Sequence, residues 1–157
     1  MAYPVVMSKK HNGTVGWLSA ETVEGTTQSF KAGQLVLGAA SGVVNITVTG
    51  STTGILGIAE VDASGTSGAA FPKVEIVEPG DILEMSLVNN STTLVTAALS
   101  DLYKKYGLYV SGGSCYLDQN TTTFGQIVGF VLDSNGAFTS RVLVTVLPAN
   151  LIVNAGL

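Results

Sequence analysis

Charge is the scarcest property of this 157-residue sequence. Seven Lys and Arg and eleven Asp and Glu residues make up 11% of the chain, against about 25% in an ordinary soluble domain. Such a surface must be built from Ser, Thr, Gly, Asn and apolar groups. These groups are buried against another subunit at less cost than charges are. We therefore expect a component of an assembly; a neutral, Ser/Thr-rich secreted β domain is the alternative.

Cysteine, histidine and long apolar runs are also scarce. Cys115 is the single cysteine, which excludes an intrachain disulfide and multi-cysteine metal sites, and we expect a buried thiol rather than a catalytic one. A net charge of −4 with two basic doublets predicts no binding of nucleic acid. The apolar runs have strand length, well short of the roughly 20 residues that span a membrane. The first ten residues place their charges after an apolar piece, so we expect neither a signal peptide nor membrane association.

Motifs that carry chemistry are missing as well. His11, the single histidine, lies in a Gly-flanked segment, and the sequence contains no Gly-x-Ser-x-Gly elbow and no Gly-rich phosphate loop. Acidic residues gather between Glu60 and Glu84, but Asp62 and Asp81 lack the alternating spacing of a calcium loop. We interpret these carboxylates as strand and turn residues; a hydrolase built from them has no specific support. We predict no enzymatic activity, no catalytic residue, no metal and no cofactor.

From Phe30 onward the sequence consists of short β-prone runs separated by Gly, Asn and Ser. Residues 73–77 alternate between apolar and polar side chains, as in a strand with one buried face. Further runs occur at 34–37, 43–48, 54–59, 82–88, 107–110, 125–131 and 142–147. Short strands at this spacing are typical of a sandwich or a small barrel. We therefore predict a mainly β fold.

One segment between the strands has helical spacing. Capping side chains at Asn89, Asn90 and Ser91 precede apolar residues spaced three and four apart, and two lysines and Gly107 follow. The apolar residues of this segment are Leu94, Val95, Ala98, Leu99 and Leu102. Cap, apolar stripe, C-terminal cations and terminal glycine together predict one short helix over about residues 92–106.

The runs on the two sides of this segment correspond in order. Residues 34–37 correspond to 107–110, 54–59 to 125–131, and 72–79 to 142–148. Gly57 and Gly129 are 72 positions apart, and Pro79 and Pro148 are 69 apart. The nearly constant offset predicts an internal duplication, with units 30–88 and 107–150 joined by the helix. Glycine inside a strand predicts a bulge or a close backbone approach at Gly57 and Gly129.

Residues 1–29 show neither alternation nor helical spacing, so we predict an extended N-terminal arm before a single β-rich domain over 30–157. Several large groups of this arm would be costly to leave in water and should pack on the domain or on a neighbouring subunit. The candidate partner-contact residues are Tyr3, Pro4, Val5, Trp17 and Leu18.

The order of these features resembles that of small structural proteins of tailed bacteriophages, most of all capsid decoration proteins, also called cement or auxiliary head proteins. The resemblance covers about residues 30–150 and is carried by Phe-x-x-Gly-x-Leu-Val at 30–36, Gly-Ile-Leu-Gly-Ile-Ala at 54–59, the alternating strand at 73–77, the predicted helix, Gly-Leu-Tyr-Val at 107–110, Asp118, and Val-Leu-Val-Thr-Val-Leu at 142–147. It is a likeness of order, without a diagnostic motif.

The resemblance implies a virion protein that binds the outer surface of the phage head, made in the host cytoplasm during assembly. Its partners would be the major capsid protein and further copies of itself, as a homotrimer. The long arm departs from the shortest members of the family, and the low charge also suits a tail component. A tail-associated or secreted β domain that binds a glycan or receptor therefore stays open as the alternative function.

Overall fold

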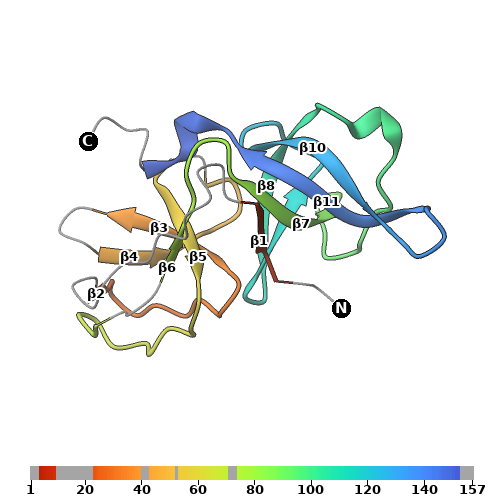
Figure 1. Cartoon of the computed structure of the whole chain (residues 1–157). Coiled ribbons are helices and arrows are strands. Elements are labelled where there is room, and N and C mark those ends of the chain that lie inside the picture. Colours follow the sequence, from red (N-terminus) through yellow and green to blue (C-terminus); the bar gives the residue numbers. More distant parts are fainter. Residues whose placement is uncertain (1–3, 10–22, 40–42, 52, 71–73, 153–157) are drawn as a thin grey trace.

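The computed structural model describes residues 4–9, 23–39, 43–51, 53–70 and 74–152. These residues are mainly β and form two sheets (Figure 1), which confirms the predicted fold class. The strands are β1 (Val6–Lys9), β2 (Val23–Glu24), β3 (Leu35–Ala39), β4 (Val43–Ile46), β5 (Ile55–Ala59), β6 (Val74–Ile76), β7 (Ile82–Val88), β8 (Lys105–Ser111), β9 (Ser114–Asp118), β10 (Gly125–Leu132) and β11 (Phe138–Val146). Helical geometry in the described ranges is limited to short 3₁₀ turns, among them η2 (Leu99–Asp101) and η3 (Pro148–Asn150).

The two sheets form the two lobes of the molecule (Figure 1). The first lobe is the five-stranded sheet β2-β4-β3-β5-β6, and the second is the six-stranded sheet β1-β7-β11-β10-β8-β9. β7 pairs with β9 as well as with β11, so the larger sheet curls back on itself. β1 comes from the N-terminal segment and pairs with β7, which places it in the second lobe although β2 to β6 follow it in sequence.

The two lobes share one order of strand pairing. In the first lobe β2 pairs with β4 in parallel, and β4-β3-β5-β6 follow as antiparallel neighbours. In the second lobe β7 pairs with β9 in parallel, and β9-β8-β10-β11 follow as antiparallel neighbours. The sequence runs that correspond to one another occupy equivalent strands in this order. A common origin of the two units by duplication stays a prediction.

The structure contains two apolar clusters, one shared between the lobes and one within the first lobe. Together they explain why the residues of β5 do not alternate between apolar and polar. One cluster contains Leu35, Ile55 and Ile58 of the first lobe together with buried residues of β7 to β11, so it is shared between the lobes. The other lies within the first lobe around Phe30 and Leu56. Every residue of β5 is buried, because its two faces meet the two clusters. Such strands appear in sequence as continuous apolar runs.

The glycines inside β5 and β10 adjoin register irregularities, as predicted for both positions. The pairing of β3 with β5 skips Leu56, next to Gly57, and the pairing of β10 with β11 skips Val128, next to Gly129. A Cβ atom on Gly57 would lie 2.1 Å from the carbonyl oxygen of Glu75 on β6. Gly57 is therefore a position where a second backbone approaches too closely for any side chain.

The predicted helix over residues 92–106 is wrong. Residues 95–98 have no regular structure, η2 makes a single 3₁₀ turn, and β8 already begins at Lys105. The first part of the segment binds neighbouring strands: Val95 N donates to Leu87 O at 2.9 Å, and Ala97 N donates to Thr139 O at 2.9 Å. Thr and Val disfavour a helix, so these hydrogen bonds decide the conformation.

Candidate interaction surfaces

The described part of the predicted arm packs on its own chain. Val5 is 1% exposed, and its backbone N–H donates to Gly33 O at 3.0 Å. Pro4, the residue before it, is exposed. The structure thus brings Pro4 and Val5 to the junction of the two lobes. Tyr3, Trp17 and Leu18 lie outside the described residues, so their predicted contacts stay predictions.

Arg141 on β11 holds the start of this segment. Its Nε atom lies 2.8 Å from Oε1 of Glu84 on β7, and Nη1 donates to Ser86 Oγ at 3.1 Å. Nη1 and Nη2 also approach the Pro4 carbonyl oxygen at 3.4 and 3.3 Å. The planar guanidinium can meet several acceptors at once, which suits it to such a junction. One side chain therefore ties β7, β11 and the N-terminal segment together.

A hollow of about 270 Å³ lies beside this junction, between β1 and the strands β5 and β6. Pro4, Val5, Val6 and Ile58 contribute to its apolar wall. Glu60 and Glu75 supply carboxylates to the same hollow. We call this hollow the β1 groove. Its volume is below the roughly 300–1,000 Å³ of most sites for small molecules and cofactors.

Asp62 and Asp81, two other acidic residues between positions 60 and 84, have structural roles. Asp62 accepts a hydrogen bond from Ala32 N at 2.9 Å and one from Lys31 Nζ at 3.0 Å, and these interactions lower the pKa of its carboxyl group. Asp81 is buried and accepts a hydrogen bond from Glu78 N at 2.8 Å. The described ranges contain no group of three or more His, Cys, Asp or Glu residues that could hold a metal ion.

Three further buried carboxylates, Glu24, Asp101 and Asp118, have structural roles that the sequence did not predict. Glu24 accepts hydrogen bonds from Ser64 N at 2.6 Å and Gly65 N at 3.0 Å. Asp118 accepts hydrogen bonds from Asn90 N at 2.8 Å and Asn120 N at 3.1 Å. Asp101, the third, accepts a hydrogen bond from Ala98 N at 2.9 Å. Carboxylates that bind backbone N–H groups satisfy the polar groups of loops.

Cys115 on β9 is buried, as expected, and its sulfur lies 3.5 Å from Thr47 Oγ1. Burial raises the pKa of its thiol to about 11, despite the opposing effect of its hydrogen bond with Thr47. The reactive form of cysteine is the thiolate, so this thiol is inert at neutral pH.

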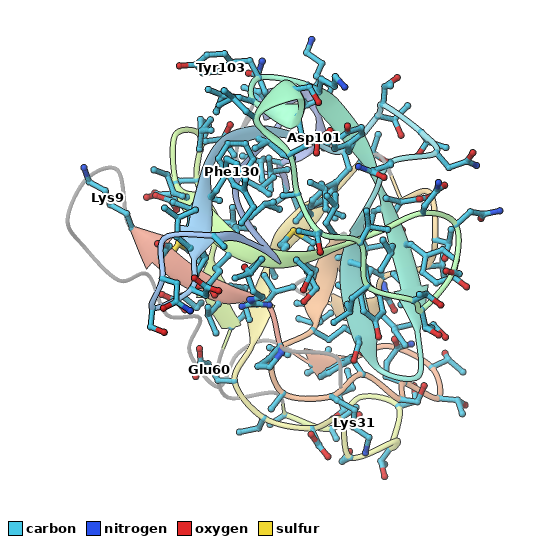
Figure 2. All side chains as sticks on the ribbon, turned by 90° about the vertical axis from the view of Figure 1, so that its right-hand side faces the viewer. Lys9, Lys31, Glu60, Asp101, Tyr103 and Phe130 are labelled. Atoms are coloured by element: carbon cyan, nitrogen blue, oxygen red, sulfur yellow. The ribbon has the colours of Figure 1, made fainter. Side chains whose placement is uncertain are left out.

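Exposed apolar side chains occur at two places in the second lobe, the segment before β8 and the β10–β11 hairpin. Leu99 is 68% and Tyr103 67% exposed on the segment that replaces the predicted helix, and Leu132 and Phe138 are exposed at the β10–β11 hairpin. Tyr103 N donates to Ile127 O at 2.9 Å, which holds this segment against β10. We call Leu99 and Tyr103 the apolar end. Figure 2 shows Tyr103 and Glu60 toward opposite ends of the molecule, so the apolar end and the β1 groove are separate surfaces.

No helix in the described ranges is long and apolar enough to cross a membrane. Comparison with known proteins leaves the resemblance to phage decoration proteins as an expectation from the sequence. The chain matches no family model, no curated protein and no solved structure.

Proposed function

We propose that this chain is a structural virion protein that binds the outer surface of a phage capsid and stabilises contacts between major capsid protein subunits. The apolar end is the observation that carries the proposal. Leu99 and Tyr103 are each about two-thirds exposed on a chain of which only 11% is charged. Exposed apolar and aromatic side chains on a charge-poor surface are typical of the centre of a protein interface.

The shared apolar cluster supports a mechanical role. Because residues of both sheets pack into one core, a load applied to one lobe is passed to the other without a flexible linker between them. A protein that strengthens a shell needs such a rigid body and adhesive surfaces, and the proposal assigns it no catalytic step. We further propose that it acts as a homotrimer on the capsid. Simultaneous contacts of one trimer with several subunits would let modest individual interfaces give tight binding.

Cosedimentation with heads tests the proposal. Full-length protein is mixed with expanded heads of the phage that encodes it, and its native mass is measured in parallel. The expected result is a discrete trimer that saturates the heads. Replacing both Leu99 and Tyr103 by Ser should abolish cosedimentation or trimer formation. Val48→Ser is the matched control, because Val48 is 60% exposed on the first lobe. Unbound monomeric protein would contradict the proposal.

Glycan or receptor binding by a tail-associated or secreted domain is the competing function. The observation in its favour is the exposed ring of Tyr103 beside Gln126, whose Nε2 donates to the Tyr103 carbonyl oxygen at 2.7 Å. Sugars stack on exposed aromatic rings next to polar groups. Reproducible binding on a glycan array that is lost in Tyr103→Ser, without binding to heads, would favour this function over the first.

A further inference from the structure

We infer that Tyr103 is a preorganised anchor for a second protein whose contact surface carries carboxylates, which bind Lys104 and Lys105 beside it. The inference deepens the proposed function and rests on it in one respect, because both take the apolar end as a contact surface. It adds the chemistry of the partner, an acidic surface with an apolar centre.

The backbone of Tyr103 has an unfavourable conformation. Its φ is +65°, in the left-handed region that a bulky residue rarely enters. The other described residues with positive φ are Thr27, Asn90 and glycines, none of them aromatic. Glycine or asparagine at position 103 would remove this strain. Strained residues gather at functional sites, so a large aromatic side chain kept at this cost indicates a role outside the fold.

Two hydrogen bonds fix this backbone while the ring stays free. The Tyr103 N–H donates to Ile127 O at 2.9 Å, and the Tyr103 carbonyl oxygen accepts from Gln126 Nε2 at 2.7 Å. The side chain is 67% exposed, and Figure 2 shows it at the edge of the molecule, with Asp101 nearer the body. A ring on an ordered backbone loses little conformational entropy on binding, and tyrosine is enriched among the residues that dominate interface energies.

Two lysines lie beside Tyr103. Lys104 is 53% exposed, and its Nζ atom lies 3.6 Å from Oδ1 of Asp101. Lys105 is exposed and is the register partner of Gln126. Directly opposed residues share a face of a sheet, so Lys105 lies beside the side chain that holds Tyr103. Lys105 forms no ion pair with a described residue. The surface therefore carries an uncompensated positive charge.

Charge complementarity selects the partner. Carboxylates opposite Lys104 and Lys105 would form ion pairs at the rim of an interface, while Leu99 and Tyr103 fill its apolar centre. A two-fold contact of this surface with itself would instead bring the lysines of two copies together, and like charges that face each other are costly. An acidic surface with an apolar centre satisfies both parts of the apolar end and its surroundings.

NMR titration of the full-length, isotope-labelled chain tests the chemistry of the partner. The probe is the capped peptide Asp-Leu-Asp-Leu-Asp, and the control peptide carries Asn at the three Asp positions. We expect the acidic peptide to shift the amide signals of Leu99, Tyr103, Lys104, Lys105 and Gln126 at millimolar concentration, and added salt to weaken binding. The control peptide should bind at least about fivefold more weakly. Absence of shifts, shifts located elsewhere, or equal binding of both peptides would overturn the inference.

Charge-matched variants locate the binding surface. Lys105→Gln should weaken binding of the acidic peptide about two- to fivefold, as the loss of an exposed ion pair does. Lys9→Gln on β1 changes the net charge equally and should leave binding unchanged, because Lys9 lies away from Tyr103 (Figure 2). Equal weakening by the two variants would mean a nonspecific effect of charge and would overturn the inference.

The strain at Tyr103 predicts opposite effects of one substitution on stability and on binding. Tyr103→Asn should raise the melting temperature by about 2–4 °C, because asparagine tolerates the left-handed region. The same variant should weaken peptide binding roughly tenfold, as the loss of an interface anchor does. Thr27→Asn is the control, because Thr27 has φ +50° and its replacement should leave binding unchanged. A lower melting temperature of Tyr103→Asn would show that the ring stabilises the fold, and it would overturn the anchor role.

The same measurements separate the inference from the capsid role and from other occupants. Peptide binding without cosedimentation with heads would contradict the capsid role and support the inference. Cosedimentation without peptide binding would do the reverse. Binding to vesicles of phosphatidylglycerol and phosphatidylcholine, without peptide binding, would identify a lipid surface as the occupant and overturn the inference. A dimer that Lys105→Gln dissociates, without peptide binding, would identify a second copy and overturn it too.

Discussion

The guanidinium of Arg141 and the carboxylate of Glu84 form a cross-strand ion pair at 2.8 Å, and the Arg141 side chain is 11% exposed. The same guanidinium reaches the Pro4 carbonyl oxygen, so the pair joins the neighbouring strands β7 and β11 to the N-terminal segment. Ion pairs in such partly buried positions matter most when one partner is removed, because the other charge is then left without compensation.

Arg141→Ala should therefore destabilise the chain by about 2–3 kcal/mol. It should also increase hydrogen exchange at the backbone amides of β1, since the anchor of Pro4 is lost. Lys31→Ala is the control, because the Lys31–Asp62 pair is largely exposed at 59% and 55% and exposed ion pairs contribute little to stability. Urea denaturation and exchange mass spectrometry measure both effects. Equal destabilisation by the two variants would contradict the role of Arg141.

Gly57→Ala and Gly129→Ala should differ strongly. The Cβ atom added at Gly57 meets backbone, the Glu75 carbonyl oxygen at 2.1 Å, whereas the one at Gly129 meets the Leu143 Cδ1 atom at 3.1 Å. A side chain can move aside, but a paired strand cannot do so without losing its ladder. We expect about 3 kcal/mol or more for Gly57→Ala and about 1 kcal/mol or less for Gly129→Ala. Thermal denaturation of the two variants distinguishes them, and similar values would contradict this account.

Asp101 anchors the irregular segment that the sequence suggested would be a helix. Its carboxylate accepts hydrogen bonds from Ala98 N at 2.9 Å and from the Tyr106 hydroxyl at 2.7 Å, and Lys104 Nζ lies 3.6 Å away. Asp101→Ala should cost about 2–3 kcal/mol, because two buried or partly buried donors lose their acceptor. Tyr106→Phe should cost about 1 kcal/mol. A neutral effect of Asp101→Ala in urea denaturation would contradict the structure.

Alkaline pH should destabilise the fold through two buried groups. Burial raises the pKa of Cys115 from 9.0 to about 11, and burial together with the Asp101 hydrogen bond raises the pKa of Tyr106 from 10.0 to about 12. The unfolded chain therefore loses these protons at lower pH than the folded chain. Stability should be fully present below pH 9 and should fall between about pH 9 and 12, by up to roughly 1.4 kcal/mol per pH unit for each group.

The Cys115→Ala variant isolates one of these groups. The difference in unfolding free energy between wild type and Cys115→Ala should be largest near pH 8 and should shrink toward pH 11. Urea denaturation across this range measures it. A difference that stays constant with pH would contradict the burial of the thiol as the cause.

Much of the strand pattern could be predicted from the sequence, because Gly, Asn and Ser residues separate the short β-prone runs from one another. The register irregularities next to Gly57 and Gly129 could also be predicted, because glycine inside a strand usually marks a bulge or a close backbone approach. The irregular conformation of residues 95–98 could not be predicted from the sequence. Residues such as Leu94 and Val95 have helical spacing by position alone, and their actual hydrogen bonds go to strands that are distant along the chain.

The candidate surfaces were harder to predict. The sequence predicts that Pro4 and Val5 contact a partner as part of an N-terminal arm. It does not predict the pairing of β1 with β7, because the two strands are about 77 positions apart. Glu60 and Glu75 belong to an acidic run in the sequence, and only the register of β5 with β6 shows that both face one groove. Periodicity within a segment carries no information about which strand will pair with it.

Quantitative mass spectrometry of purified virions, with heads and tails separated, tests the central claim most directly. The account predicts that the chain is present on the head fraction in a fixed ratio to the major capsid protein and in multiples of three. Absence of the chain from heads, or its recovery with the tails alone, would contradict the proposed role in capsid stabilisation.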